Sequence, residues 1–249
     1  MRYIDPTFGV TLTKDVSYGA VLNFSTNFVD DLQLDIYQPA GDNAEARAVV
    51  FWVHGGGFTG GDKSEMETMC NYYASRGYVA IALNYRLVTA WDRQNLGAIY
   101  AGADTQAAVR WLRTQASALR IDPEKIAICG NSSGGYAVLG AAYDQGLKVH
   151  NPNLPDVSFA VAACVDVSGR LYNLPSIGHG EAPLLINHGM QDMRVPFAYA
   201  LELESTALAA RIVCETNYYP QQGHTVMRAE TDDIMPVALD FLYRHMIEE

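Results

Sequence analysis

The stretch KIAICGNSSGGYAVLGAAY, residues 125–143, decides the fold of this 249-residue chain. Its first part, Lys125–Cys129, has the short apolar pattern of a buried strand, and the part from Tyr136 onward has the composition of a helix. Between them lies GNSSGG, which contains the pattern G-x-S-x-G. A serine between a strand and a helix sits on a sharp turn that exposes its hydroxyl, so Ser132 is a candidate nucleophile. The alternative is a glycine-rich turn with no chemistry.

Strands and helices alternate regularly around this stretch, which predicts an α/β fold with a mostly parallel central sheet and helices on both faces. Two early segments alternate apolar and polar residues, as an antiparallel hairpin does. Strands are expected at Val16–Phe24, Leu32–Pro39, Ala48–Val53, Val79–Asn84, Lys125–Cys129, Phe159–Val167, Pro183–Asn187 and Ile212–Tyr219. Helices are expected near Ser64–Ser75, Leu96–Leu119, from Ser132, Pro196–Ala210 and Asp232–Met246.

The length of the chain favours one α/β domain over residues 1–249. One interval, Ser168–Ala182, has neither helical nor strand patterning and is rich in glycine, proline and serine. It is too short for a large lid, so we expect a minimal cap and a site that is open or roofed by a small loop.

The charge of the chain bears on its partners and location. Because 17 basic residues stand against 28 acidic ones, for a formal charge of −11, nucleic acid and anionic membrane surfaces are disfavoured. No apolar stretch approaches the length of a membrane span. The start, Met1–Thr13, lacks a basic segment followed by an apolar one, so the chain as given is expected to be cytoplasmic; a signal removed from the natural precursor would make it secreted.

The cysteines, Cys70, Cys129, Cys164 and Cys214, show no paired metal-ligand spacing. At least three of them lie in apolar runs, which favours buried free thiols and leaves a disulfide open. Asp and His residues are spread singly along the chain, which disfavours a metal-dependent hydrolase.

A serine hydroxyl needs a base and a group that orients the base. Asp192, in INHGMQDMRVP, follows an apolar strand, and His224, in QQGHT, follows the next one. Both are therefore expected at the carboxyl ends of strands, and the order Ser132, Asp192, His224 is the one this architecture uses. Asp166, at the end of VAACVDV, is the competing acid. We interpret His188 as structural.

Attack on a carbonyl leaves negative charge on its oxygen, and hydrogen-bond donors that are already in position stabilise that charge. The loop His54–Gly57, HGGG, offers the N–H groups of Gly56 and Gly57, and the N–H of Ser133 at a helix N-terminus adds a third. We expect His54 to support this loop and the nearby Asp62 and Lys63 to fix it.

Taken in order, HGGGFTGGDKS, NYRL, IDPEKIAICGNSSGG, HGMQD and GH resemble the hormone-sensitive-lipase-like esterases and related bacterial carbohydrate esterases of the α/β-hydrolase fold. The resemblance runs from about Leu32 to the C-terminus. It implies hydrolysis of carboxylic esters through an acyl-enzyme, without cofactor or metal. The chain departs from these families at Asn131 and Ser133, where relatives usually carry an acidic residue and an alanine, and it lacks their N-terminal helical cap.

The missing cap favours small esters or an accessible polymer substituent, so the expected substrates are acetyl or feruloyl-type esters, including those on plant polysaccharide. Four aromatic residues are candidates to flank the site: Phe58, Trp91, Tyr136 and Tyr172. An arylformamidase-like amide hydrolase and a non-catalytic binding protein on a hydrolase scaffold remain alternatives. The oligomeric state is left open.

Overall fold

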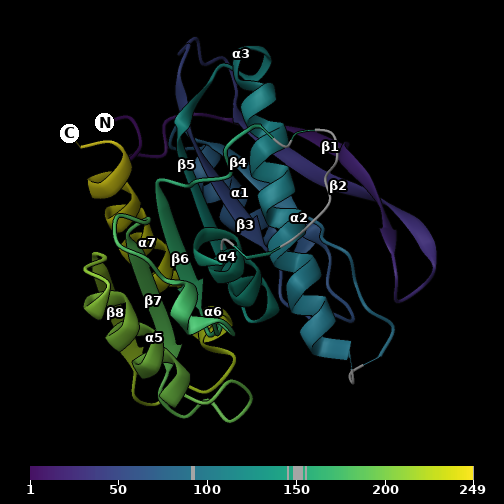
Figure 1. The fold of residues 1–249 in the computed structure, drawn as a ribbon. Helices are drawn as coiled ribbons and strands as arrows, with labels where there is room; N and C mark the ends of the chain where they lie inside the picture. The colour runs from purple at the N-terminus through teal and green to yellow at the C-terminus, as the bar shows by residue number, and fades with distance from the viewer. Residues whose placement is uncertain (91–92, 145, 148–153, 155, 249) are drawn as a thin grey trace.

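A single eight-stranded sheet organises the computed structural model, which describes residues 1–90, 93–144, 146–147, 154 and 156–248 (Figure 1). The strands are β1 (Val10–Asn23), β2 (Phe28–Pro39), β3 (Arg47–Val53), β4 (Val79–Leu83), β5 (Ile121–Asn131), β6 (Ala163–Val167), β7 (Leu184–Gly189) and β8 (Cys214–Tyr219). Their order in the sheet is β1-β2-β4-β3-β5-β6-β7-β8. Strands β3 to β8 pair in parallel, and the hairpin β1–β2 joins antiparallel at the β4 edge. The predicted α/β-hydrolase fold is confirmed.

Helices cover both faces of the sheet (Figure 1). Among the described residues they are η1 (Lys63–Met66), α1 (Glu67–Ala74), α2 (Gln94–Thr114), α3 (Ala116–Leu119), α4 (Ser133–Tyr143), η3 (Leu174–Ser176), α5 (Ala198–Ala209), α6 (Val226–Ala229) and α7 (Thr231–Met246). Successive side chains of a strand point to opposite faces of the sheet. Val49 and Phe51 therefore belong to the core under α2, α4 and α5. Val50 and Trp52 belong to the core under α1 and α7. The continuous apolar run of β3 is therefore explained by burial on both sides.

Several predicted element boundaries were wrong. Strands β1, β2 and β5 begin at Val10, Phe28 and Ile121, earlier than expected. The helix expected over Leu96–Leu119 is broken at Gln115, between α2 and α3. The strand expected from Phe159 begins only at Ala163, because the preceding backbone is held elsewhere: the guanidinium of Arg113 donates to the carbonyls of Ser158 and Ala160. The interval Ser168–Ala182 contains only the three-residue turn η3 as regular structure.

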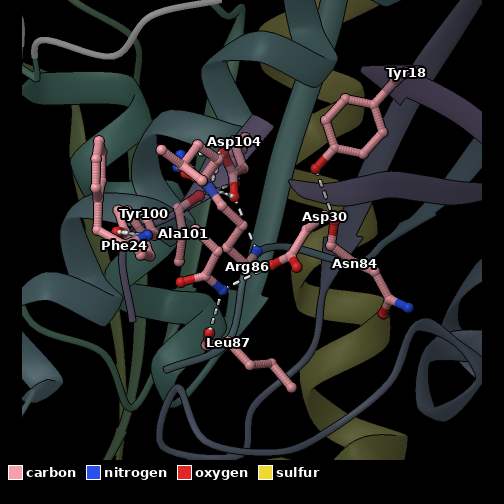
Figure 2. A network of polar contacts seen from close by, with 12 residues as sticks. Tyr18, Phe24, Asp30, Asn84, Arg86, Leu87, Tyr100, Ala101 and Asp104 are labelled. Atoms are coloured by element: carbon pink, nitrogen blue, oxygen red, sulfur yellow. Dashed lines mark hydrogen bonds and ion pairs between the residues drawn. The ribbon is translucent and has the colours of Figure 1, made fainter. Parts of the chain in front are cut away.

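A buried ion pair fixes the chain that follows β4 (Figure 2). The guanidinium of Arg86 donates to both carboxylate oxygens of Asp104 on α2, with a shortest distance of 2.7 Å, and the Arg86 N–H donates to the same carboxylate at 2.9 Å. Arg86 also lies over the ring of Tyr100, whose hydroxyl accepts the N–H of Phe24. This network joins the β1–β2 hairpin, the β4 end and α2, and so holds the segment beside the glycine loop in place.

Replacing Asp104 with alanine should strongly destabilise the protein, because it leaves the guanidinium of Arg86 buried without its partner. We expect the free energy of unfolding to fall by about 3 to 5 kcal/mol, measured by urea denaturation. The control is Asp240→Ala, which removes a surface partner of Arg244 and should change stability little. Equal effects of the two substitutions would contradict a structural role for the buried pair.

Candidate active site

Ser132 occupies the turn between β5 and α4. Its backbone has φ 56° and ψ −120°, a conformation that residues with a side chain rarely adopt. The turn closes because glycines stand where no Cβ would fit: one at Gly130 would overlap the carbonyl of Gly134, and one at Gly134 would overlap the carbonyl of Val53. The sharp turn predicted from the sequence is present, and it presents the Ser132 hydroxyl to the loops beyond the sheet.

The structure brings the three predicted residues together in one hydrogen-bonded chain. Ser132 Oγ lies 2.8 Å from His224 Nε2, and His224 Nδ1 lies 2.8 Å from Asp192 Oδ2. They follow β5, β8 and β7, three strands whose carboxyl ends lie along one edge of the sheet. With Nδ1–H donated to the carboxylate, Nε2 is left to accept the serine proton.

The carboxylate of Asp192 is held ionised. Burial raises the pKa of this carboxyl, but hydrogen bonds from His188 and His224 and from the N–H groups of Val195 and Arg194 outweigh burial, so its pKa lies well below the usual value. The two backbone bonds go to Oδ1, at 2.8 and 2.9 Å. A fixed negative charge therefore faces the imidazole of His224, as an orienting acid requires.

The competing acid, Asp166, does not reach His224 in the structure. Its side chain is buried at the end of β6, against Gly135 and Gly169, and one of its oxygens accepts the N–H of Gly169 at 3.3 Å. Asp192, rather than Asp166, is thus the acid in contact with His224.

The glycine loop after β3 lies beside Ser132. Gly56 and Gly57 have φ values of 119° and 62°, and a Cβ at Gly56 would overlap the backbone of Gly60. The N–H of Gly57 donates to Ser133 Oγ at 3.0 Å. Among the described residues, the N–H groups of Gly56 and Ser133 have no hydrogen-bond acceptor. Two predicted donors are therefore available, and the third, the N–H of Gly57, is engaged by the hydroxyl of Ser133.

Tyr85 is the residue that sequence reasoning missed. Its hydroxyl donates to the carbonyl of His54 at 3.2 Å and lies 3.0 Å from Ser133 Oγ, and its ring stacks on His54 at 4.5 Å. Burial raises the pKa of Tyr85, which keeps the hydroxyl protonated. The one sequence signal for Tyr85 was its position in NYRL, one of the motifs that carry the family resemblance. Tyr85 and Ser133 together tie the glycine loop to the start of α4.

The loop-supporting roles expected from the sequence are confirmed. His54 Nδ1 lies 2.7 Å from the carbonyl of Gly55. Asp62 caps η1 by accepting the N–H of Ser64, and Asn84 donates to the same carboxylate. Lys63 Nζ pairs with Asp15 at 2.7 Å and with Asp35 at 3.0 Å, which anchors the loop to the hairpin.

A cavity of about 110 Å³ opens at Ser132. Its aromatic wall consists of Phe58, Tyr136 and Tyr172, three of the four predicted flanking residues, with neighbouring rings 5.7 and 5.2 Å apart. The fourth, Trp91, lies outside the described residues. Tyr172 comes from the short insertion and is half-exposed, so one side of the cavity faces solvent. A second cavity, of about 530 Å³, lies on the other side of the glycine loop against the hairpin and does not include Ser132.

The four thiols are unpaired and mostly buried. All four cysteines are free, as predicted, and Cys70, Cys129 and Cys164 are buried. Burial raises the pKa of all four thiols. Over the part of the chain that the structure describes, no three His, Cys, Asp or Glu side chains gather as metal ligands, and no helix is both long and apolar enough to cross a bilayer.

Comparison with known proteins assigns this fold to a class, the α/β-hydrolases. The solved structure of Thermogutta terrifontis esterase 2 phosphorylated by paraoxon is 26% identical, with a TM-score of 0.81 over 95% of this chain and 94% of that chain. Its propionate-bound form is 25% identical, with a TM-score of 0.81 over 96% and 94%. The chain belongs to the BD-FAE family, whose profile matches residues 34–176.

Curated relatives match over shorter stretches. The ethyl acetate hydrolase of Pseudomonas putida is 35% identical over 116 residues, which are 46% of this chain and 35% of that protein. The bile salt-activated lipase of Bos taurus is 30% identical over 141 residues, 51% of this chain and 22% of that protein. The chain thus spans about a third or less of the length of these two relatives.

The link between Ser133 and Tyr85 can be tested with a fluorophosphonate probe that labels an activated serine. We expect Ser133→Ala and Tyr85→Phe each to slow labelling of Ser132 about tenfold, which corresponds to about 1.4 kcal/mol, because each loosens the same loop. The double variant should be no slower than either single one, since both belong to one network. Additive losses would show that the two hydroxyls act independently.

Proposed function

We propose that this protein is a serine carboxylesterase that hydrolyses short-chain carboxylic esters through an acyl-enzyme. The observation that carries the proposal is the chain of contacts from Ser132 through His224 to Asp192, with both distances at 2.8 Å. Such a chain activates a hydroxyl that is otherwise a poor nucleophile at neutral pH. The esterase and lipase names of the relatives, and the paraoxon-phosphorylated neighbour, support the same class of reaction.

The geometry supplies each step of acyl transfer. Ser132 Oγ attacks the ester carbonyl carbon while His224 Nε2 takes the hydroxyl proton. The carbonyl oxygen becomes negative and is stabilised by the free N–H groups of Gly56 and Ser133, the latter at the N-terminus of α4. Protonated His224 then gives its proton to the departing alcohol oxygen as the carbon–oxygen bond breaks, which leaves an acyl group on Ser132.

Water then hydrolyses the acyl-enzyme with the help of the same groups. His224 removes a proton from the water molecule that attacks the acyl carbon, and returns it to Ser132 Oγ when the bond to the serine breaks. The products are a carboxylic acid and the free enzyme. Asp192 remains ionised throughout and stabilises the imidazolium that forms twice.

The cavity at Ser132 favours a small acyl group. With a volume of about 110 Å³ it suits acetyl and other short chains, and the propionate bound in the Thermogutta esterase and the substrate in the name of the Pseudomonas relative support this choice. A feruloyl group would have to extend along Tyr172 toward solvent. The open side leaves room for a bulky alcohol, including a sugar unit of an acetylated polysaccharide.

The first test is hydrolysis of p-nitrophenyl acetate, butyrate and octanoate, methyl ferulate and acetylated xylan. We expect the acetate and butyrate to be the best substrates, and Ser132→Ala to lower kcat by about 10⁴-fold or more. Ser117→Ala, an exposed serine on α3, is the matched control and should behave like the wild type.

Two outcomes would contradict the proposal. Turnover of N-formylkynurenine far above that of p-nitrophenyl acetate would make the protein an amide hydrolase of the arylformamidase type. Equal activity, or equal inactivity, of the wild type and Ser132→Ala would remove Ser132 from the chemistry and favour a binding protein on a hydrolase scaffold.

A further inference from the structure

The carboxylate of Asp192 faces two imidazoles. Its Oδ1 is fixed by two backbone N–H groups, whereas its Oδ2 lies 2.8 Å from His224 Nδ1 and 3.5 Å from His188 Nε2. One oxygen is therefore placed between the imidazole that contacts Ser132 and a second one that does not. Whatever increases the attraction between Asp192 and His188 weakens the hold of Asp192 on His224.

His188 is a fully buried side chain on β7. Its Nε2 lies 2.9 Å from the carbonyl oxygen of Val195, so this nitrogen carries a proton and donates it there. Its Nδ1 is buried and has no hydrogen-bond partner among the described residues. A buried ring nitrogen without a partner is costly and points to a role that one tautomer alone does not fulfil.

Asp166 lies on β6, the strand next to that of His188. It pairs in register with Ile186 across β6 and β7, and because strand side chains alternate, Asp166 and His188 point to the same face of the sheet. The Oδ1 of Asp166 is also buried without a hydrogen-bond partner. An unpaired carboxylate oxygen and an unpaired ring nitrogen thus lie on neighbouring strands directly behind Asp192.

We propose that His188 is a positioning residue which controls how Asp192 is divided between the two imidazoles, and that the charge of Asp166 on the neighbouring strand favours a second proton on His188. The proposal rests on the proposed esterase function. With one proton, on Nε2, His188 donates to the carbonyl of Val195 and lies only at the longer distance of 3.5 Å from Asp192, whose shorter contact is with His224. With a second proton, on Nδ1, His188 becomes a cation 3.5 Å from Asp192 Oδ2 and competes with His224 for it.

The charges around His188 favour this second proton. Burial lowers the pKa of His188, but hydrogen bonds to Asp192 and Val195 and the attraction of Asp166 outweigh it and raise the pKa above its usual value. Burial raises the pKa of Asp166 to about 7, and His188 opposes that rise. Two further groups interact with Asp166, Tyr136 and Cys164, and burial raises the pKa of both, so they stay neutral. Tyr218, which pairs in register with His188 on β8 and donates its hydroxyl to Glu204, also stays neutral because burial raises its pKa.

The test is the pH dependence of kcat/KM for p-nitrophenyl acetate below neutral pH. In the wild type, protonation of His224 and of His188 should both reduce activity, so the slope of log kcat/KM against pH should exceed 1. In His188→Gln the slope should be 1, and kcat on the plateau should fall by no more than about tenfold, because the glutamine amide can still donate to Val195. In Asp166→Asn, which removes the charge that favours the second proton, the His188 step should move to lower pH.

Val165→Ala is the matched control. It lies next to Asp166 on β6 but points to the opposite face and is fully buried, so it should reduce stability without changing the slope. A wild-type slope of 1, or an unchanged profile in Asp166→Asn, overturns the proposal. If His188→Gln does not fold, the wild-type slope and the pH profile of Asp166→Asn still decide whether the proposal holds. Failure of the esterase function itself would be recognised separately, as hydrolysis that Ser132→Ala does not abolish.

Discussion

The strained turn at Ser132 is the constraint on which the rest of the site depends. A residue with φ 56° can be held there only if β5, β3 and α4 approach closely, and the glycines at 130 and 134 are what permit that approach. The sheet is buried on both faces by two cores, and the stability that this burial gives the fold offsets the strain in the Ser132 backbone. The rigid sheet edge then sets the distances among the loops after β5, β7 and β8, and so the 2.8 Å contacts of His224.

Polar side chains, as well as the sheet, hold the glycine loop in position beside Ser132. Tyr85 and Ser133 bridge the loop and the start of α4, and His54 stacks on Tyr85 beneath them. The hydroxyl of Ser133 accepts a hydrogen bond from the N–H of Gly57. The loop is therefore preorganised by side chains of this particular sequence, in addition to the backbone freedom of its glycines.

Much of this arrangement could be predicted from the sequence because it follows from local patterns. Apolar runs that end in polar loops identified the strands, and the strand–serine–helix pattern identified Ser132. Asp192 and His224 were then identified because each follows an apolar strand and so lies at its carboxyl end. Asp166 shares that strand-end signal, and only the fold shows that it lies under α4 instead of beside His224. Tyr85, the buried Arg86–Asp104 pair and the second imidazole at His188 depend on contacts between distant segments, which periodicity does not reveal.

The central claim, that Ser132 is the nucleophile activated by His224 and Asp192, is tested most directly by treating the protein with paraoxon and mapping the phosphorylated residue by peptide mass spectrometry. The account predicts one diethylphosphoryl group, on Ser132, with esterase activity lost in proportion to labelling and with no labelling in His224→Ala on the same timescale. Phosphorylation of another residue, or full activity after Ser132 is completely labelled, would contradict it.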